Sequence, residues 1–218
     1  MNTNAARPAR RSRLAAPLPL SFYDRETEVV ARELLGAILR FDSPHGVASG
    51  RIVETEAYLG EHDEACHAVV GETERTRCLY GSPGTAYVYF IYGIHWCFNA
   101  VTREAGLPSA VLVRALEPLE GIELMRERRR LARGHRDLTN GPGKLCAALG
   151  ITGRHNGLPL DRPPLTIHPG VDIPDGDVIV TPRIGITRSA DWPLRWIIKD
   201  NPYVSRTPLH FPRRSLSP

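Results

Sequence analysis

Short runs of apolar and β-branched residues, each bounded by turn-forming residues, recur along most of the chain. Runs of this length with Gly, Pro, Asn, Asp or Ser at their ends are typical of β-strands. The pattern predicts strands at residues 37–41, 48–58, 85–92, 109–116, 165–167, 178–181 and 194–199.

Three other segments place apolar residues at helical spacing. One covers residues 24–36, a second begins at Pro118, and a third follows Pro142 and ends at Gly150. Proline is common in the first turn of a helix, and glycine is common just past its end. Strands outnumber helices, so we expect a single α+β domain with a curved, largely antiparallel sheet and flanking helices.

The two ends of the chain lack this periodicity. Residues 1–20 are rich in Arg, Pro and Ala, so we expect them to be disordered. Residues 21–206 form the expected folded domain, and residues 207–218 are expected to be a loose tail. No apolar run approaches the ~20 residues of a membrane helix, and no apolar segment follows the N-terminal arginines.

Cysteine spacing and charge add two further expectations. The four cysteines form no Cys-x-x-Cys pair, which favours reduced thiols in a cytoplasmic protein. Four of the 28 lysines and arginines lie within the first 16 residues, which contain no acid, and this excess equals the whole net charge of +4. A solvated tail is favoured there over a basic arm that binds nucleic acid.

Residues 51–58 carry two glutamates on a predicted strand. Side chains alternate between the two faces of a strand, so Glu54, Glu56 and Tyr58 should share one face with Ile52. A carboxylate is costly to bury unless it is paired or used in chemistry. This face is therefore either a functional site or the solvent side of an edge strand.

Arg114 lies inside the apolar run at residues 111–116. An arginine within a strand normally needs a carboxylate partner, and the face that carries Glu54 and Glu56 is the natural candidate. We therefore expect carboxylates, a guanidinium and aromatic side chains to converge on one pocket.

An acidic loop contains His62, Asp63, Glu64 and His67. A zinc-binding His-Glu-x-x-His motif places its two imidazoles four residues apart on one helical face. Here the histidines are five residues apart, Asp follows the first, and no third ligand is evident. We expect one functional histidine in this loop, no metal and no other cofactor.

Residues 85–99 are unusually rich in aromatic side chains. Tyr87 and Tyr89 should share one strand face, and Tyr92 directly precedes Gly93. A Tyr-Gly pair can end a strand and open a hairpin whose second strand runs to Asn99. An aromatic residue at an exposed tip favours insertion into a ligand; the alternative is a hairpin folded flat on the core.

Six segments, in this order, carry a family resemblance: RIVETEAYLG, DEACH, SPGTAYVYFIYGIHWCFNA, VLVRALEPLEG, NGPGKLCAALGI and PLRWIIKDNPYVS. Together they closely resemble the alkyladenine (3-methyladenine) DNA glycosylase family, from about residue 22 to residue 205. The resemblance implies that Glu56 activates a water molecule, that Arg114 lies beside that water, and that the backbone carbonyl of Val204 helps to hold it.

The resemblance also implies a pocket for the target base. Tyr58, His67 and Tyr89 would form its walls, and Asn99 would form a floor that screens purines by their exocyclic groups. Tyr92 would fill the gap left in the duplex, so the hairpin would protrude and insert into DNA from the minor groove.

The implied function is that of a monofunctional DNA glycosylase, acting as a monomer on damaged double-stranded DNA in base excision repair. Its substrates would be alkylated purines such as 3-methyladenine and 7-methylguanine, with hypoxanthine and ethenoadenine as further candidates. No lysine lies in the pocket motifs, whereas a lyase needs an amine nucleophile. Lys144, at the start of the third helix, either binds a phosphate or is solvated.

Two other functions fit parts of the pattern. A non-catalytic module for damaged DNA would use the same aromatic residues to stack bases, but it gives no reason for Glu56 to face Arg114. A metal-dependent hydrolase built on the cluster at residues 62–67 would lose activity with a chelator.

Overall fold

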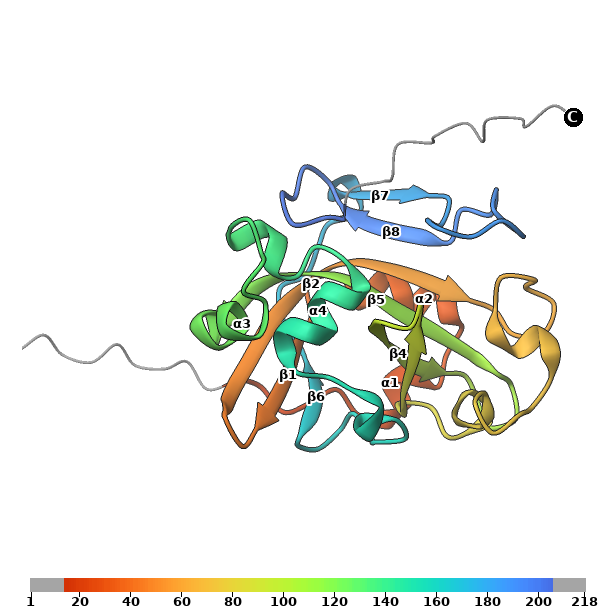
Figure 1. Ribbon diagram of the computed structural model, residues 1–218. Coiled ribbons are helices and arrows are strands. Elements are labelled where there is room, and N and C mark those ends of the chain that lie inside the picture. Colours follow the sequence, from red (N-terminus) through yellow and green to blue (C-terminus); the bar gives the residue numbers. More distant parts are fainter. Residues whose placement is uncertain (1–13, 206–218) are drawn as a thin grey trace, which may run out of the picture.

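The fold is built on one antiparallel sheet. The computed structural model describes residues 14–205, and residues 1–13 and 206–218 lie outside the described part. Its eight strands run in the order β3-β4-β5-β2-β1-β6, with β8 paired to β2 and β7 paired to β8 (Figure 1). Every pairing is antiparallel, which confirms the expected α+β class. The strands are β1 (Ile38–Ser43), β2 (Gly46–Tyr58), β3 (Ala86–Ile91), β4 (His95–Thr102), β5 (Ser109–Glu120), β6 (Leu165–His168), β7 (Val178–Thr181) and β8 (Arg195–Ile198).

Helices cover the sheet where its apolar side chains gather. The α-helices are α1 (Leu20–Tyr23), α2 (Thr27–Glu33), α3 (Ile122–Arg128) and α4 (Pro142–Leu149), and the 3-10 helices are η1 (His67–Val70), η2 (Arg77–Tyr80), η3 (His135–Leu138), η4 (Gly153–His155) and η5 (Asp175–Asp177). Helix α4 packs on β4 and helix α2 on β2, and both contribute to the main core. None of the helices in the described part is both long and apolar enough to span a membrane.

The two longest strands, β2 and β5, lie side by side in the middle of the sheet. Their register pairs Glu56 with Leu112 and shifts between Ile52 and Glu54. Such a shift marks a β-bulge, which re-aims the side chains around it. Ile52 accordingly packs in the main core and not beside Glu54, so the predicted sharing of one face by Ile52 and the glutamates is wrong.

Strand β5 is longer than the apolar pattern predicts. Pro118, expected in the first turn of a helix, pairs with Gly50 of β2, and α3 begins at Ile122. Strand β4 pairs with β5 only at residues 109–112, and among residues 14–205 no other strand pairs with β5 on that side at Pro118. The missing N–H of proline therefore leaves no ladder bond unmade. Gly121, with φ of 74°, makes the turn into α3.

The N-terminal segment joins the fold earlier than expected. Residues 14–20 belong to the described part and contact β6. The Leu18 N–H donates to the Ile167 carbonyl at 2.7 Å, and the Ala15 carbonyl accepts from His168 Nδ1 at 2.8 Å. The expected disorder of residues 1–20 does not describe this last part of the segment.

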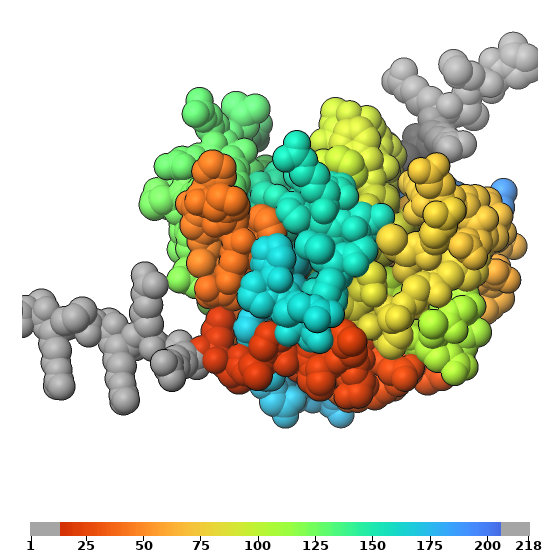
Figure 2. Space-filling view, turned by 90° about the horizontal axis from the view of Figure 1, so that it is seen from below, coloured from red at the N-terminus to blue at the C-terminus, as the bar shows by residue number. Residues whose placement is uncertain are grey.

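Strands β3 and β4 form the hairpin expected from the Tyr-Gly pair. Tyr92 and Gly93 occupy the turn with φ of 55° and 69°, and the Ile94 N–H donates to the Ile91 carbonyl at 3.3 Å. Positive φ at both central residues is characteristic of type I′ hairpin turns. The Tyr92 side chain is 78% exposed, and Figure 2 shows this segment (yellow-green) projecting from the surface.

Candidate active site

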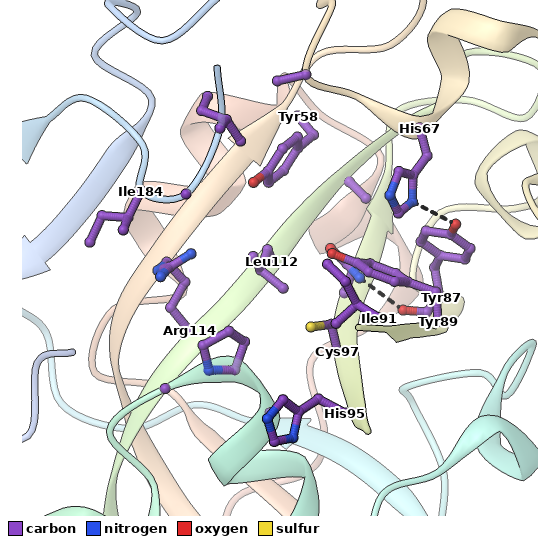
Figure 3. A pocket seen from close by; sticks show the side chains of 18 of the residues that line it. Tyr58, His67, Tyr87, Tyr89, Ile91, His95, Cys97, Leu112, Arg114 and Ile184 are labelled. Carbon is purple, nitrogen blue, oxygen red and sulfur yellow. Dashed lines mark hydrogen bonds between the residues drawn. The ribbon is translucent and has the colours of Figure 1, made fainter. Parts of the chain in front are cut away.

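A cavity of about 510 Å³ opens beside the central strands. Its lining includes Tyr58 of β2, Tyr89 of β3, Asn99 of β4, Arg114 of β5 and His67 of η1. In Figure 3, Arg114 lies on one side of the cavity and His67 and Tyr89 lie on the other. Five predicted site residues, each from a different element, thus meet around one space.

The aromatic side of the cavity is a packed cluster. The ring centroids of His67 and Tyr89 are 4.4 Å apart, and those of Tyr87 and Tyr89 are 5.4 Å apart. His67 Nδ1 shares a hydrogen bond with the Tyr87 hydroxyl at 2.9 Å. Burial, with the nearby Arg75 guanidinium, lowers the pKa of His67 to about 4. The imidazole that faces the cavity is therefore neutral near pH 7.

Asn99 is held in one orientation at the base of this cluster. Its side chain is buried, and Nδ2 donates to the Tyr87 carbonyl at 3.0 Å. Tyr87 itself was absent from the predicted pocket, although its place two residues before Tyr89 puts it on the same strand face. It fixes both His67 and Asn99.

Glu54 is completely buried, and its carboxylate accepts four hydrogen bonds. Arg114 Nε donates to Oε1 at 3.0 Å and Arg195 Nε donates to the same oxygen at 2.7 Å. The Ser205 hydroxyl donates to Oε1 at 2.8 Å, and the Ser205 N–H donates to Oε2 at 2.7 Å. Three donors thus meet Oε1 and one meets Oε2, and they join β5, β8 and Ser205 to β2, which gives Glu54 a structural role.

Glu56 is equally buried but less saturated. Its Oε2 accepts from the Tyr58 hydroxyl at 2.9 Å and from Arg114 Nη1 at 3.0 Å, while Oε1 accepts only from the Ile184 N–H at 2.8 Å. One acceptor site on Oε1 therefore has no donor among the described residues. Tyr58, Arg114 and Ile184 all line the cavity, so the Glu56 carboxylate lies directly behind its wall.

The buried charges around the two glutamates balance. Arg114 and Arg195 supply two positive charges against those of Glu54 and Glu56. Burial alone would lower the pKa of Arg114, but the adjacent carboxylates of Glu56 and Glu54 outweigh it and raise that pKa. Removing one member of such a network typically costs about 3–5 kcal/mol because an uncompensated charge stays behind. The expected pairing of Arg114 with this face is confirmed.

The acidic loop does not assemble a metal site. Asp63 is fully buried and binds Arg183 through two hydrogen bonds, Nη1 to Oδ2 at 2.5 Å and Nη2 to Oδ1 at 2.8 Å. His67 is hydrogen-bonded to the Tyr87 hydroxyl within the aromatic cluster. Within residues 14–205, no group of three or more His, Cys, Asp or Glu side chains is arranged to hold a metal ion. The metal-dependent hydrolase thus lacks its supposed ligand set.

Val204 does not line the cavity, and the backbone beside Glu56 comes from another segment. Ile184, Gly185 and Ile186 line the cavity, and the Ile184 N–H binds Glu56. The residue after Val204, Ser205, binds Glu54. The expected role of the Val204 carbonyl in holding a water stays a prediction, and the backbone group that binds Glu56 is the Ile184 N–H.

Lys144 and Tyr92 both lie at the cavity. Lys144 Nζ donates to Asp137 Oδ1 at 2.5 Å and to Asn140 Oδ1 at 2.8 Å, so it is neither free nor simply solvated. It also lines a second cavity of about 870 Å³, which shares Arg114 and Ile184 with the first. Tyr92 contributes to the lining of the first cavity from the exposed hairpin turn.

Two buried arginines of the site were missed, although the sequence carries a signal for them. Arg195 is followed by Trp-Ile-Ile in β8, and Arg183 precedes Ile184 in an equally short apolar context. Like Arg114, each of these arginines lies among apolar residues and therefore needs an acidic partner. Their acids, Glu54 and Asp63, are distant in sequence.

Comparison with known proteins gives a consistent result over nearly the whole described chain. A family model described as methylpurine-DNA glycosylase (MPG) matches residues 21–202. A protein of Myxococcus xanthus (strain DK1622) is 50% identical over 194 residues, which cover 88% of this chain and 94% of that protein. A protein of Rhodopseudomonas palustris (strain HaA2) is 49% identical over 192 residues, 88% of this chain and 92% of its own. A protein of Methanocella arvoryzae is 46% identical over 193 residues, 87% and 96% respectively. All three carry the provisional name 3-methyladenine DNA glycosylase.

The lowered pKa of His67 predicts a pH-dependent stability. In the unfolded chain the imidazole takes up a proton near pH 6.5, but in the fold it does so only near pH 4. Between these values the unfolded state binds more protons, so the free energy of unfolding falls as the pH is lowered through this window. Urea unfolding of His67→Gln should show a smaller slope there, by up to about 1.4 kcal/mol per pH unit. The exposed His45→Gln variant is the control, and parallel curves for wild type and His67→Gln would contradict this assignment.

Proposed function

Because the chain belongs to the methylpurine-DNA glycosylase family, we propose that it is a monofunctional DNA glycosylase. It everts an alkylated purine from duplex DNA and hydrolyses the N-glycosidic bond. One observation carries the proposal: of two buried carboxylates on one strand, Glu54 accepts four hydrogen bonds, whereas Glu56 accepts three, all from residues that line the cavity.

The cavity fits a flat, cationic base. A target base inside a duplex must be turned out of the stack at a cost of a few kcal/mol. The rings of Tyr58, His67 and Tyr89 offer stacking surfaces for it. Purines such as 3-methyladenine and 7-methylguanine carry a positive charge, which adds a cation–π attraction of ~0.5–2 kcal/mol. A neutral His67 avoids repelling that charge.

Hydrolysis needs a base for water and a negative charge near the sugar. A water oxygen attacks C1′ of the everted nucleotide, the electron pair of the C1′–N bond leaves with the purine, and Glu56 Oε1 accepts the water proton. The same carboxylate stabilises the oxocarbenium character of the sugar. The Arg114 guanidinium pairs with Glu56 and donates to its other oxygen, Oε2, at 3.0 Å. A cationic base leaves as a neutral molecule, so it needs no strong acid.

The lysine positions support hydrolysis without lyase chemistry. The chain contains only Lys144 and Lys199, and a lyase requires a free amine at C1′. Lys144 Nζ is already bound to Asp137 and Asn140. We propose that the product is an intact strand with an abasic site.

The duplex would meet the face that carries the hairpin turn and the second cavity. Tyr92 adopts a left-handed backbone conformation, which costs a non-glycine residue of order 1–2 kcal/mol, and it exposes its ring to solvent. Both costs are explained if the ring enters the duplex from the minor groove and fills the place of the everted base.

The phosphate backbone of the DNA would lie along the second cavity. Lys144 lines it together with Arg133 and Arg136, whose guanidinium groups have no acidic partner among residues 14–205. Arginine suits bidentate contacts with phosphate.

A single lesion in one duplex needs only one such site, so we propose that the protein acts as a monomer.

Replacing Glu56, the proposed general base that takes a proton from the attacking water, is the simplest test of the function. Glu56→Gln should keep lesion binding and lose about 10²–10⁴-fold in the single-turnover rate, the usual contribution of a positioned general base. The measurement is release of free base from duplexes with one 7-methylguanine or hypoxanthine each, in the presence of EDTA. Glu117→Gln, a half-exposed glutamate of β5 bound to Arg51, is the matched control.

Three outcomes of this experiment would contradict the proposal. Equal rates for wild type and Glu56→Gln would remove Glu56 from the chemistry. Binding of the lesion without any base release would favour the non-catalytic DNA-binding module. Loss of activity with EDTA would favour the metal-dependent hydrolase.

Tyr92→Ala tests the wedge. Loss of a base-stacking aromatic residue costs about 1–3 kcal/mol, so the concentration for half-maximal rate should rise roughly 10–100-fold. Tyr92→Phe keeps the planar ring and should behave like wild type. The rate with saturating Tyr92→Ala protein and an already unpaired lesion should change least, since little unstacking remains to be offset. Unchanged behaviour of Tyr92→Ala on all substrates would contradict insertion of the hairpin.

A further inference from the structure

We propose that the buried pair of Asp63 and Arg183 positions the catalytic carboxylate by holding the Ile184 N–H against Glu56. Asp63 and Arg183 are then positioning residues that act through Ile184 and touch neither substrate nor the reacting atoms. This inference rests on the proposed role of Glu56. It also gives a function to the acidic loop, whose aspartate forms no metal site.

The pair is closed off from solvent and geometrically rigid. Both side chains are fully buried, and the guanidinium binds the carboxylate through two hydrogen bonds of 2.5 and 2.8 Å. Asp63 also accepts from the N–H groups of Leu59 and Ala65, each at 3.1 Å. Asp63 thus accepts from four donors, two in the loop that follows β2 and two on Arg183.

Arg183 reaches from this loop back to the catalytic strand. Its Nη1 donates to the Ala57 carbonyl at 2.9 Å, and its guanidinium carbon lies 4.7 Å from the centre of the Tyr58 ring. The next residue, Ile184, donates its N–H to Glu56. Two consecutive residues of one segment thus contact three consecutive residues of β2.

The hydrogen bonds of the sheet do not hold residues 183 and 184 in place. Residues 183 and 184 follow β7 (Val178–Thr181) and precede β8, so they belong to none of the strand ladders in the described part of the chain. Within the described residues, the side-chain hydrogen bonds of Arg183 go to Asp63, Ala57 and Ser189. The position of the Ile184 N–H therefore depends on the direction of the Arg183 fork.

A buried ion pair is weak evidence for stability, because apolar replacements are often neutral or stabilising. The planar Arg183 guanidinium fixes the orientation of this segment through its paired hydrogen bonds to Asp63. A lysine keeps the charge but cannot bind both carboxylate oxygens in one plane or stack on Tyr58 in the same way. If the fork is lost, Ile184 moves and Glu56 Oε1 loses its donor. A carboxylate with one donor fewer has a higher pKa and a less defined orientation.

The test is Arg183→Lys, compared with wild type in single-turnover base release. The maximal rate should fall about 10- to 100-fold, the usual effect of a misplaced catalytic group. The protein concentration for half-maximal rate should change less than about threefold. The apparent pKa of the acidic limb of the pH–rate profile should rise, an effect that a merely structural role would not produce. Arg40→Lys alters another ion pair, on β1, and is the control with an unchanged rate and profile.

A second variant and a double mutant keep the inference open to contradiction. Asp63→Asn removes the charge of the partner and should show the same rise in pKa and fall in rate, even if Arg183→Lys does not fold. In a Glu56→Gln background, Arg183→Lys should cause no further loss, because both changes act on one group. A full additional loss there, or an unshifted pH profile, would overturn the positioning role.

The two proposals fail in different ways. A slow Glu56→Gln variant with an unaffected Arg183→Lys variant would overturn the positioning role and leave the glycosylase mechanism standing. An unaffected Glu56→Gln variant would overturn the mechanism itself.

Discussion

The buried network of Glu54, Glu56, Arg114 and Arg195 is the interaction on which the rest of the site depends. Two carboxylates two residues apart on an inner strand can stay ionised only if opposite charges meet them there. Arg114 comes from β5 and Arg195 from β8, the two strands that flank β2 at this point. The antiparallel register of the sheet thereby becomes a condition for the chemistry.

The network also gives the two glutamates different environments. Glu54 accepts four hydrogen bonds and ties three segments together, while Glu56 accepts three and keeps one acceptor site. Across the cavity, burial keeps His67 neutral beside stacked tyrosines. One side of the cavity is thus polar and charged, and the other is aromatic. In the proposed mechanism the sugar meets the first side and the base meets the second.

Much of this site follows from local patterns in the sequence. Alternation along a strand places Glu54 and Glu56 together, an arginine among apolar residues identifies Arg114, and the Tyr-Gly pair predicts the turn at Tyr92. The family resemblance, confirmed by the comparisons, adds roles that no spacing could supply.

Other features could not be predicted because their causes are not local. Ile184 lies in a segment without periodicity and reaches Glu56 across 128 positions of the chain, so no pattern points to it. Asp63 shows its role only through Arg183, 120 positions away. Strand β5 can include Pro118 because β4 pairs with β5 only at residues 109–112, and the extent of that pairing is a property of the sheet and not of the segment.

A crystal structure of the protein on a duplex with a lesion nucleotide made non-hydrolysable by 2′-fluorination would test the central claim most directly. The account predicts a water within about 2.6–3.2 Å of Glu56 Oε1, placed between that oxygen and C1′ of a nucleotide turned into the aromatic cavity. A nucleotide that stays in the duplex, or a C1′ atom whose nearest carboxylate is not Glu56, would contradict it.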